Sequence, residues 1–162
     1  MSTDRFEFSA RPNEPVVEIS RWFPSPPVAV FEAWATPEHV CHWWGPANVS
    51  LVACDVDLRV GGAYRYEYRA PDGRSFSVNG RFVEIDPPSR LVTNFTVDIT
   101  PGDEVVEVTS FDPSAGGTVV RIVSLHRSSS ARDAQLADGS MQAAVEGELS
   151  RLDEVLARSE PA

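Results

Sequence analysis

Six short strand-like segments joined by tight turns occupy more than a third of the 162-residue chain, and they restrict its fold most strongly. The segments are residues 49–58, 63–70, 75–86, 90–98, 104–112 and 117–126. Val, Tyr, Phe, Ile and Thr are frequent in them, and Gly, Pro and Asp mark the turns between them. Because connections this short join neighbouring antiparallel strands, the pattern predicts a curved antiparallel meander.

The segment AYRYEYRA at 63–70 indicates that one face of this sheet is covered. Its three tyrosines, Tyr64, Tyr66 and Tyr68, alternate with charged residues. An aromatic face opposite a charged face is typical of an antiparallel sheet with one side in water. Three phenol hydroxyls on a buried face each need a hydrogen-bond partner, so a wet or ligand-filled cavity is expected there.

A further strand and two short helices are predicted before the meander. Residues 15–22 carry β-branched and aromatic residues with partial alternation, which favours a strand. Ser25 followed by two prolines predicts a helix start, with serine as the N-cap, and Thr36-Pro37 repeats that signal. Residues 1–13 lack periodicity and are expected to form a flexible arm.

After the meander the period becomes helical. Ser130 to Asp133 resembles a capping box, which predicts a short helix over 130–137. Beyond Gly139 an apolar stripe at helical spacing predicts one long amphipathic helix; it comprises Met141, Val145, Leu149, Leu152 and Leu156. A sheet covered on one side must bury its apolar face, and this final helix is the only predicted element long enough to do so.

Three strings in this order resemble a known family. They are VFEAWATPEHVCHWWGP (30–46), DLRVGGAYRYEYRAPDG (57–73) and GRFVEIDPPSRLV (80–92), with a weaker echo in RDAQLADGSM (132–141). The chain resembles the START-like (SRPBCC, helix-grip) superfamily, specifically bacterial AHSA-like proteins, which are related to the activator of heat-shock-protein ATPase. The resemblance covers residues 14–157, nearly the whole chain.

The resemblance implies an α+β helix-grip fold: a curved antiparallel seven-stranded sheet wrapped around a long C-terminal helix, with two short helices after the first strand. It implies a single START-like domain over residues 14–158. It also implies a deep hydrophobic cavity beneath the final helix, with no metal and no cofactor. Relatives include lipid carriers, polyketide cyclases, aromatases and co-chaperone domains, so the fold does not fix the function.

The chain departs from this family in one place. Such proteins often carry a tryptophan early in the final helix, where this sequence has Ala144-Val145. A smaller residue there widens the cavity unless neighbouring aromatic side chains fill the space. No string specific to the eukaryotic co-chaperone is present.

Our leading prediction is binding of a hydrophobic or aromatic small molecule in the cavity. The predicted lining is Trp34, Trp44, Tyr64, Tyr66, Tyr68, Phe76, Phe95, His126 and Met141. For each aromatic residue, ordinary core packing is the alternative interpretation. His126 shares strand parity with Ile122 and Ser124, which places it near the cavity mouth if that face is inward; a solvent-exposed strand end is the alternative.

Two other functions remain open from the sequence. A cyclase-, dehydratase- or hydrolase-like enzyme would use Glu84 and His126 for proton transfer, and both would have to face one cavity. The alternative for Glu84 is an outward carboxylate paired with Arg81 or Arg90. A co-chaperone-type interaction module would instead expose an apolar patch. A homodimer is compatible with the sequence, which carries no specific signal for it.

The charge pattern excludes several chemistries. All 14 basic residues are arginine, against 24 Asp and Glu, which gives a formal charge of −10. Without lysine the chain cannot form a Schiff base or carry a Walker-type phosphate loop. Nucleic acid and anionic membrane lipids are disfavoured as partners, because binding either depends on basic side chains. The acids concentrate in residues 98–112 and 131–162, and we expect them on solvated surface away from the aromatic pocket.

The cysteines and the apparent lack of targeting signals favour a cytoplasmic protein. No signal peptide and no apolar stretch of membrane-spanning length is apparent. Cys41 and Cys54 fit either a disulfide or two buried thiols, and we expect thiols in a reducing cytosol. The two cysteines with His39 and His42 lack the ligand spacing of a zinc site, so no metal is expected.

Overall fold

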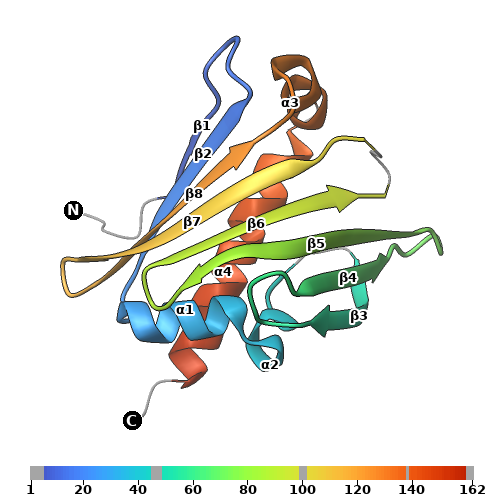
Figure 1. The fold of residues 1–162 in the computed structure, drawn as a ribbon. Coiled ribbons are helices and arrows are strands. Elements are labelled where there is room, and N and C mark those ends of the chain that lie inside the picture. Colours follow the sequence, from blue (N-terminus) through green and yellow to red (C-terminus); the bar gives the residue numbers. More distant parts are fainter. Residues whose placement is uncertain (1–5, 45–48, 99–101, 138, 160–162) are drawn as a thin grey trace.

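The computed structural model describes residues 6–44, 49–98, 102–137 and 139–159. Among them, eight strands form one antiparallel sheet in the order β1-β2-β8-β7-β6-β5-β4-β3 (Figure 1). The strands are β1 (Glu7–Ser9), β2 (Val16–Phe23), β3 (Ser50–Val56), β4 (Ala63–Arg69), β5 (Ser75–Asp86), β6 (Arg90–Val97), β7 (Val105–Ser114) and β8 (Gly117–Leu125). The helices are α1 (Pro27–Ala35), α2 (Pro37–Val40), α3 (Ser129–Leu136) and α4 (Ser140–Ser159).

The long helix α4 runs along one face of the sheet, as expected from its length (Figure 1). Helices α1 and α2 lie at one end of α4, and α3 lies at the other end beside β2 (Figure 1). The predicted apolar stripe faces the sheet: Leu149, Leu152 and Leu156 are buried, and Met141 and Val145 are half-buried. The order of elements confirms an α+β fold with short helices after β2 and a long C-terminal helix.

The expectation of seven strands is one strand short. Residues 7–9, placed in the flexible arm, form β1 and pair with Ser20, Ile19 and Glu18 of β2. Three residues with no clear alternation give too weak a local signal, and the strand exists because β2 offers a free edge to pair with. Residues 1–5 of the arm lie outside the described part of the chain.

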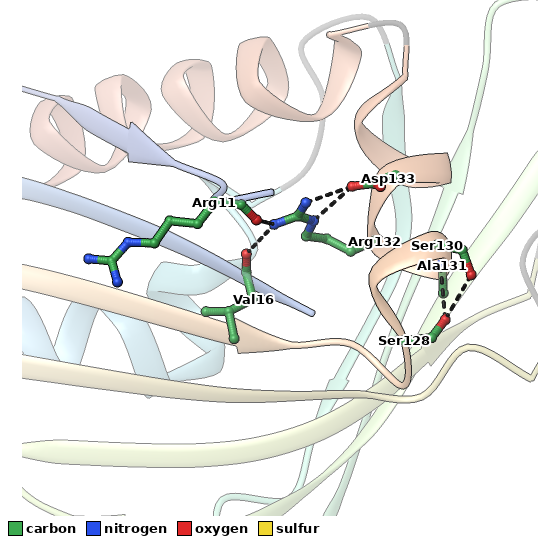
Figure 2. Close-up of polar contacts among 7 residues, drawn as sticks. All are labelled: Arg11, Val16, Ser128, Ser130, Ala131, Arg132 and Asp133. Atoms are coloured by element: carbon green, nitrogen blue, oxygen red, sulfur yellow. Dashed lines mark hydrogen bonds and ion pairs between the residues drawn. The ribbon is translucent and has the colours of Figure 1, made fainter. Parts of the chain in front are cut away.

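Helix α3 is fixed to this N-terminal segment through a buried arginine (Figure 2). Arg132 is 3% exposed, and its guanidinium donates to the backbone oxygens of Arg11 at 2.7 Å and Val16 at 3.0 Å. It also bonds the Asp133 carboxylate at 2.6 Å. The charge is therefore paired, and each guanidinium nitrogen donates a hydrogen bond, which is the condition for burying an arginine at acceptable cost.

The helix caps differ from the sequence prediction in two places. Helix α3 begins after Ser128, whose hydroxyl accepts from the Ala131 amide, so Ser130 is not the cap (Figure 2). Helix α1 has Pro26 at its N-cap without a side-chain bond. Ser25 is instead buried, and its carbonyl accepts a hydrogen bond from the Thr118 hydroxyl at 2.7 Å. That bond joins the start of α1 to β8.

The tyrosine alternation in β4 is confirmed. Tyr64, Tyr66 and Tyr68 are all buried on the face toward α4. The Tyr64 ring crosses β5 at Gly80, where an added Cβ would overlap the ring and its hydroxyl. Glycine at that position therefore lets an aromatic ring lie directly on the backbone of the neighbouring strand.

The two cysteines form a disulfide, so the expectation of two buried thiols is wrong. Cys41 follows α2 and Cys54 lies in β3, with their Cα atoms 6.2 Å apart. The bond ties the α2 turn to an edge strand of the sheet. The sequence left both alternatives open, and the packing of α2 against β3 decides between them.

Candidate functional site

Two small pockets lie on the inner face of the sheet and share part of their walls. The β4–β7 pocket lies between those strands and the α1–α2 segment, and the α4 pocket lies between β2, β7, β8 and α4. Trp34, Trp44 and Glu107 line both, so the pockets adjoin. Their volumes are about 30 and about 40 Å³. Each can hold about two or three water-sized groups.

Aromatic rings form the shared wall. The Trp34 and Trp43 ring centroids lie 4.8 Å apart, and Trp44 lies 5.7 Å from Tyr66, which in turn lies 5.4 Å from Tyr64. Trp43 and Trp44 make an edge contact with centroids 5.3 Å apart, and tilted and edge contacts are favoured arrangements for aromatic pairs. The wall is therefore one continuous row of rings running from α1 to β4.

Hydrogen bonds fix Trp43 to the surrounding elements. The Trp43 indole N–H donates to the Ala33 carbonyl at 2.8 Å, which holds the α2 turn against α1. The Arg151 guanidinium donates to the Trp43 carbonyl at 3.1 Å and joins the same turn to α4. Trp43 is thus held to both α1 and α4 by hydrogen bonds.

Glu107 of β7 is the central polar group. Its carboxylate lines both pockets and accepts a hydrogen bond from the Ser124 hydroxyl at 3.2 Å. Burial raises the pKa of Glu107 to about 7, because the apolar surroundings disfavour the charged form more than Ser124 stabilises it. A carboxylate in this position can accept or release a proton near neutral pH.

A second carboxylate faces the same space from the helix side. Glu148 of α4 lines the α4 pocket together with Glu107. Burial is the main cause that raises the pKa of the Tyr66 hydroxyl, and the charges of Glu107 and Glu148 raise it further. The Tyr66 hydroxyl is therefore electrostatically coupled to carboxylates from both walls.

A family comparison identifies the fold's relatives. The family model described as activator of Hsp90 ATPase homolog 1-like protein matches residues 24–157. The chain belongs to this family. No functionally curated protein matches it.

Solved bacterial structures share the fold of this Hsp90-activator-homolog-like chain. A Rhodobacter sphaeroides protein is 26% identical with a TM-score of 0.86, and the match covers 96% of this chain and all (100%) of that one. A Mycobacterium smegmatis protein is 21% identical with a TM-score of 0.82, covering 97% of this chain and 100% of that one. A Nitrosomonas europaea protein is 22% identical with a TM-score of 0.78, covering 88% and 94%. These likenesses establish the architecture and not the ligand.

The pockets of this family member contain five of the predicted lining residues. Trp34, Trp44, Tyr64, Tyr66 and Met141 line one or both of them. Tyr68 and Phe76 stack on each other with centroids 5.1 Å apart and pack as core, which was the alternative interpretation. Their assignment to ligand binding stays a prediction.

Phe95 lines a different concavity. An open groove of about 570 Å³ contains it, together with Arg65, Asn79, Arg81, Asn94 and Thr96. These polar residues alternate with the inward-facing side chains of β4 to β6, so the groove lies on the face away from α4. Phe95 itself pairs with Gly80, which pairs with Tyr64, so its side chain has inward parity and packs against the core. It is not among the residues that line the two inner pockets, and its assignment to ligand binding stays a prediction.

His126 is buried at the end of β8 but belongs to neither inner pocket. Its Nδ1 lies 3.6 Å from the Asp103 carboxylate, and Gln135 of α3 donates to the same carboxylate at 2.5 Å. Burial lowers the pKa of His126, while Asp103 opposes that change. Strand parity with Ser124 is confirmed, but the strand carries His126 beyond the end of the cavity.

Glu84 lies on the opposite, exposed face of the sheet. Its carboxylate accepts from the Arg90 guanidinium at 2.6 Å, which is the outward arrangement considered as its alternative. A bulge between Phe82 and Glu84 shifts the strand register at this point. Glu84 and His126 therefore do not meet in one cavity, and the enzyme built on this pair lacks its required geometry.

Sequence reasoning missed the carboxylates of the site. We expected the acids of 98–112 and 131–162 to lie away from the pocket, and Glu107 and Glu148 contradict this. In β7 apolar residues occupy both parities, so alternation does not mark Glu107 as inward. Glu148 lies seven residues after Met141, a spacing that returns to the same helix face and could have identified it.

The described ranges contain neither a metal-binding cluster nor a membrane-spanning helix. No group of three or more His, Cys, Asp and Glu side chains is arranged to hold a metal ion there. No helix within those ranges is long and apolar enough to cross a membrane.

Proposed function

We propose that this chain binds a small organic molecule with an apolar body in the two adjoining inner pockets. The observation that carries the proposal is a carboxylate, Glu107, shared by two pockets whose walls are otherwise mainly aromatic and aliphatic. Ligand sites in proteins have this composition: an apolar lining with a few polar groups that orient the ligand.

The pocket volumes define the size of ligand. At about 30 and about 40 Å³, the pockets together accept a short chain or a small head group. A larger ligand requires a shared side chain to move and join them. Trp44 is suited to this, since it is half-buried and lines both pockets.

Neither alternative function has a comparable supporting observation. Glu84 and His126 lie on different parts of the molecule, so the proposed proton-transfer pair is not assembled. The exposed large apolar residues are distributed over α1, β3, the β3–β4 connection, β5, β7 and β8. We therefore place small-molecule binding ahead of catalysis and of a protein-interaction role.

A binding experiment with a pocket-filling variant tests this proposal. Tryptophan fluorescence and protein NMR shifts would be followed during titration with 1-pentanol, 2-phenylethanol, hexanoate and n-pentylamine. We expect saturable binding of at least one probe. Val145→Phe, which places a ring in the α4 pocket, should abolish binding, whereas Val83→Phe on the exposed face of β5 should not.

Two results would overturn the proposal. One is the absence of a saturable response to any of the four probes from folded protein. The other is binding that Val145→Phe leaves unchanged, because the ligand would then lie elsewhere. A circular dichroism spectrum of each variant establishes that it is folded.

A further inference from the structure

We propose that this chain forms a weak two-fold dimer through an aliphatic patch on the outer face of its sheet, which is the face away from α4 (Figure 1). Two adjacent rows of side chains form the patch. The inference goes beyond the proposed function and does not depend on it. The strand register, the exposure of these side chains and the charges beside them support it.

Six aliphatic side chains from β6, β7, β8 and β2 make up the patch. They are Val92, Val108 and Val123 in the first row and Val106, Leu125 and Val16 in the second. Within each row, neighbouring residues are direct partners in the strand register. The rows are adjacent, because Val106 and Val108 lie two residues apart on β7 and so face the same side, about 7 Å from each other. The patch is therefore continuous over four strands.

The patch lies on the opposite face of the sheet from the hydrophobic core. On β7 the neighbouring Val105 points inward and is buried, whereas Val106 is 38% exposed. Leu125 of β8 is 43% exposed. The other members are more shielded, since they lie beside one another in the rows, and none of the six packs against the core. A sheet face in water normally carries polar residues, so this continuous aliphatic surface indicates a covering partner.

Polar and charged residues enclose the patch. The strand register places them around it: Glu84, Arg90, Asn94, Ser110, Arg121, Ser20 and Glu18. An apolar centre with a polar rim is the composition of a protein interface. The charges of this rim sum to zero, although the chain as a whole carries −10. At about 0.15 M salt, charges more than about 8 Å away are largely screened, so the remaining acids oppose association only weakly.

Two of the rim charges make a second copy of this chain the fitting partner. Arg121 and Glu18 are exposed, and neither makes an ion pair with a residue that the structure describes. They are diagonal neighbours at one corner of the patch, since Arg121 pairs with Ser20 and Glu18 with Val123. In a two-fold interface every contact occurs twice, so Arg121 of each copy can meet Glu18 of the other. A surface that carries both members of a charge pair is complementary to itself.

The size of this surface predicts a weak dimer. Neighbouring strands lie about 4.8 Å apart and same-face residues about 6.8 Å apart along a strand, so each outward residue covers about 33 Å² of the sheet. The patch and its rim then cover about 400 Å² on each copy, against about 800 Å² per partner in an interface of standard size. We therefore expect a dissociation constant between about 10 and about 500 µM.

Sedimentation equilibrium of the full chain measures this association, from about 10 µM to about 1 mM protein in about 0.15 M salt. We expect the average mass to rise from that of the monomer toward twice that value. Val106→Asp should weaken association at least about tenfold, because it places a carboxylate against the aliphatic rows of the other copy. Val52→Asp is the matched control: it makes the same change at a valine of β3 that is 45% exposed and lies outside the patch, and it should leave association unchanged.

Charge reversal tests the contact between the two copies. Arg121→Glu and Glu18→Arg each place like charges opposite one another at both contacts of a dimer, and each should weaken association at least about fivefold. An equimolar mixture of these two variants should associate about as tightly as wild type, because both contacts of the mixed dimer then join opposite charges. A change within a single copy cannot produce that recovery. Arg69→Glu, at an exposed arginine of β4 outside the patch, should have no effect.

Three results would overturn the inference. One is wild-type protein that stays monomeric over the whole concentration range, which would leave the patch to a different protein or to water. Another is a dimer that Val106→Asp does not weaken, because a different surface would then form it. The last is a mixture of Arg121→Glu and Glu18→Arg that associates no better than either variant alone. Circular dichroism establishes that each variant is folded, and the two charge variants, both at exposed positions, keep the test decisive if Val106→Asp does not fold.

Discussion

Glu107→Gln should stabilise the ligand-free protein at pH 8, although it removes the central polar group of the site. In the unfolded chain a glutamate has a pKa of 4.5, and in the folded protein that of Glu107 is about 7. The unfolded state therefore loses its proton first. Stability falls as the pH rises from about 4.5 to about 7 and stays low above that range.

The size of the effect follows from the same two values. Each pKa unit corresponds to about 1.4 kcal/mol, so the rise from 4.5 to about 7 destabilises the ionised protein by up to about 3 kcal/mol. Water that enters the pockets screens part of this penalty, which makes about 3 kcal/mol an upper bound. Glutamine keeps an acceptor for the Ser124 hydroxyl but carries no charge.

Urea denaturation followed by tryptophan fluorescence measures the difference between variant and wild type. We expect Glu107→Gln to raise the free energy of unfolding by 1–3 kcal/mol at pH 8, and by less than about 1 kcal/mol at pH 5. Glu154→Gln should change it by less than about 0.5 kcal/mol at either pH. The reasoning would be refuted if Glu107→Gln were less stable than wild type at pH 8. It would also be refuted if the variant changed the free energy of unfolding by the same amount at pH 8 and at pH 5.

Three further predictions concern other parts of the fold. Gly80→Ala should lower stability by about 1–3 kcal/mol, because the added Cβ overlaps the Tyr64 ring; thermal unfolding checks this, and an unchanged melting temperature contradicts it. His126→Asn should flatten the loss of stability below about pH 6.5, because burial lowers the pKa of His126 in the folded state and the unfolded chain binds the proton more readily. The difference in free energy of unfolding between His126→Asn and wild type should therefore change between pH 7.5 and pH 5.5, and a difference that stays constant would contradict this prediction. Cys41→Ser should cost about 3 kcal/mol in non-reducing denaturation, since the bond to Cys54 closes a loop with a sequence separation of 13; equal stability of wild type with and without a thiol reductant would contradict this.

The repeating elements of the fold could be predicted from the sequence. The alternation in β4 and the helical stripe in α4 are local patterns, and each faces the core as its period requires. Turn residues between the strands marked the meander in the same way. These predictions held because periodicity and turn chemistry act over a few neighbouring residues.

The candidate site was only partly predictable. Aromatic residues indicated a pocket, but the structure separates Trp34 and Trp44, which line it, from Tyr68 and Phe76, which pack against each other. Both groups lie on apolar faces in the sequence. Only the distance between the sheet and the helices determines which rings border open space.

The polar chemistry of the site depended on contacts between distant segments. Glu107 faces inward because of the pairing of β7 with β6 and β8, and Ser124 reaches it from the neighbouring strand. Likewise β1 forms because β2 offers an edge, and Cys41 meets Cys54 because α2 lies against β3.

The sequence by itself determined seven of the eight described strands, the long helix and their apolar faces, since these depend on local spacing. The tertiary structure decided that two carboxylates from opposite layers share one aromatic pocket. The acidity of the chain thus belongs in part to its interior, and a net charge of −10 counted along the sequence contains no information about that placement.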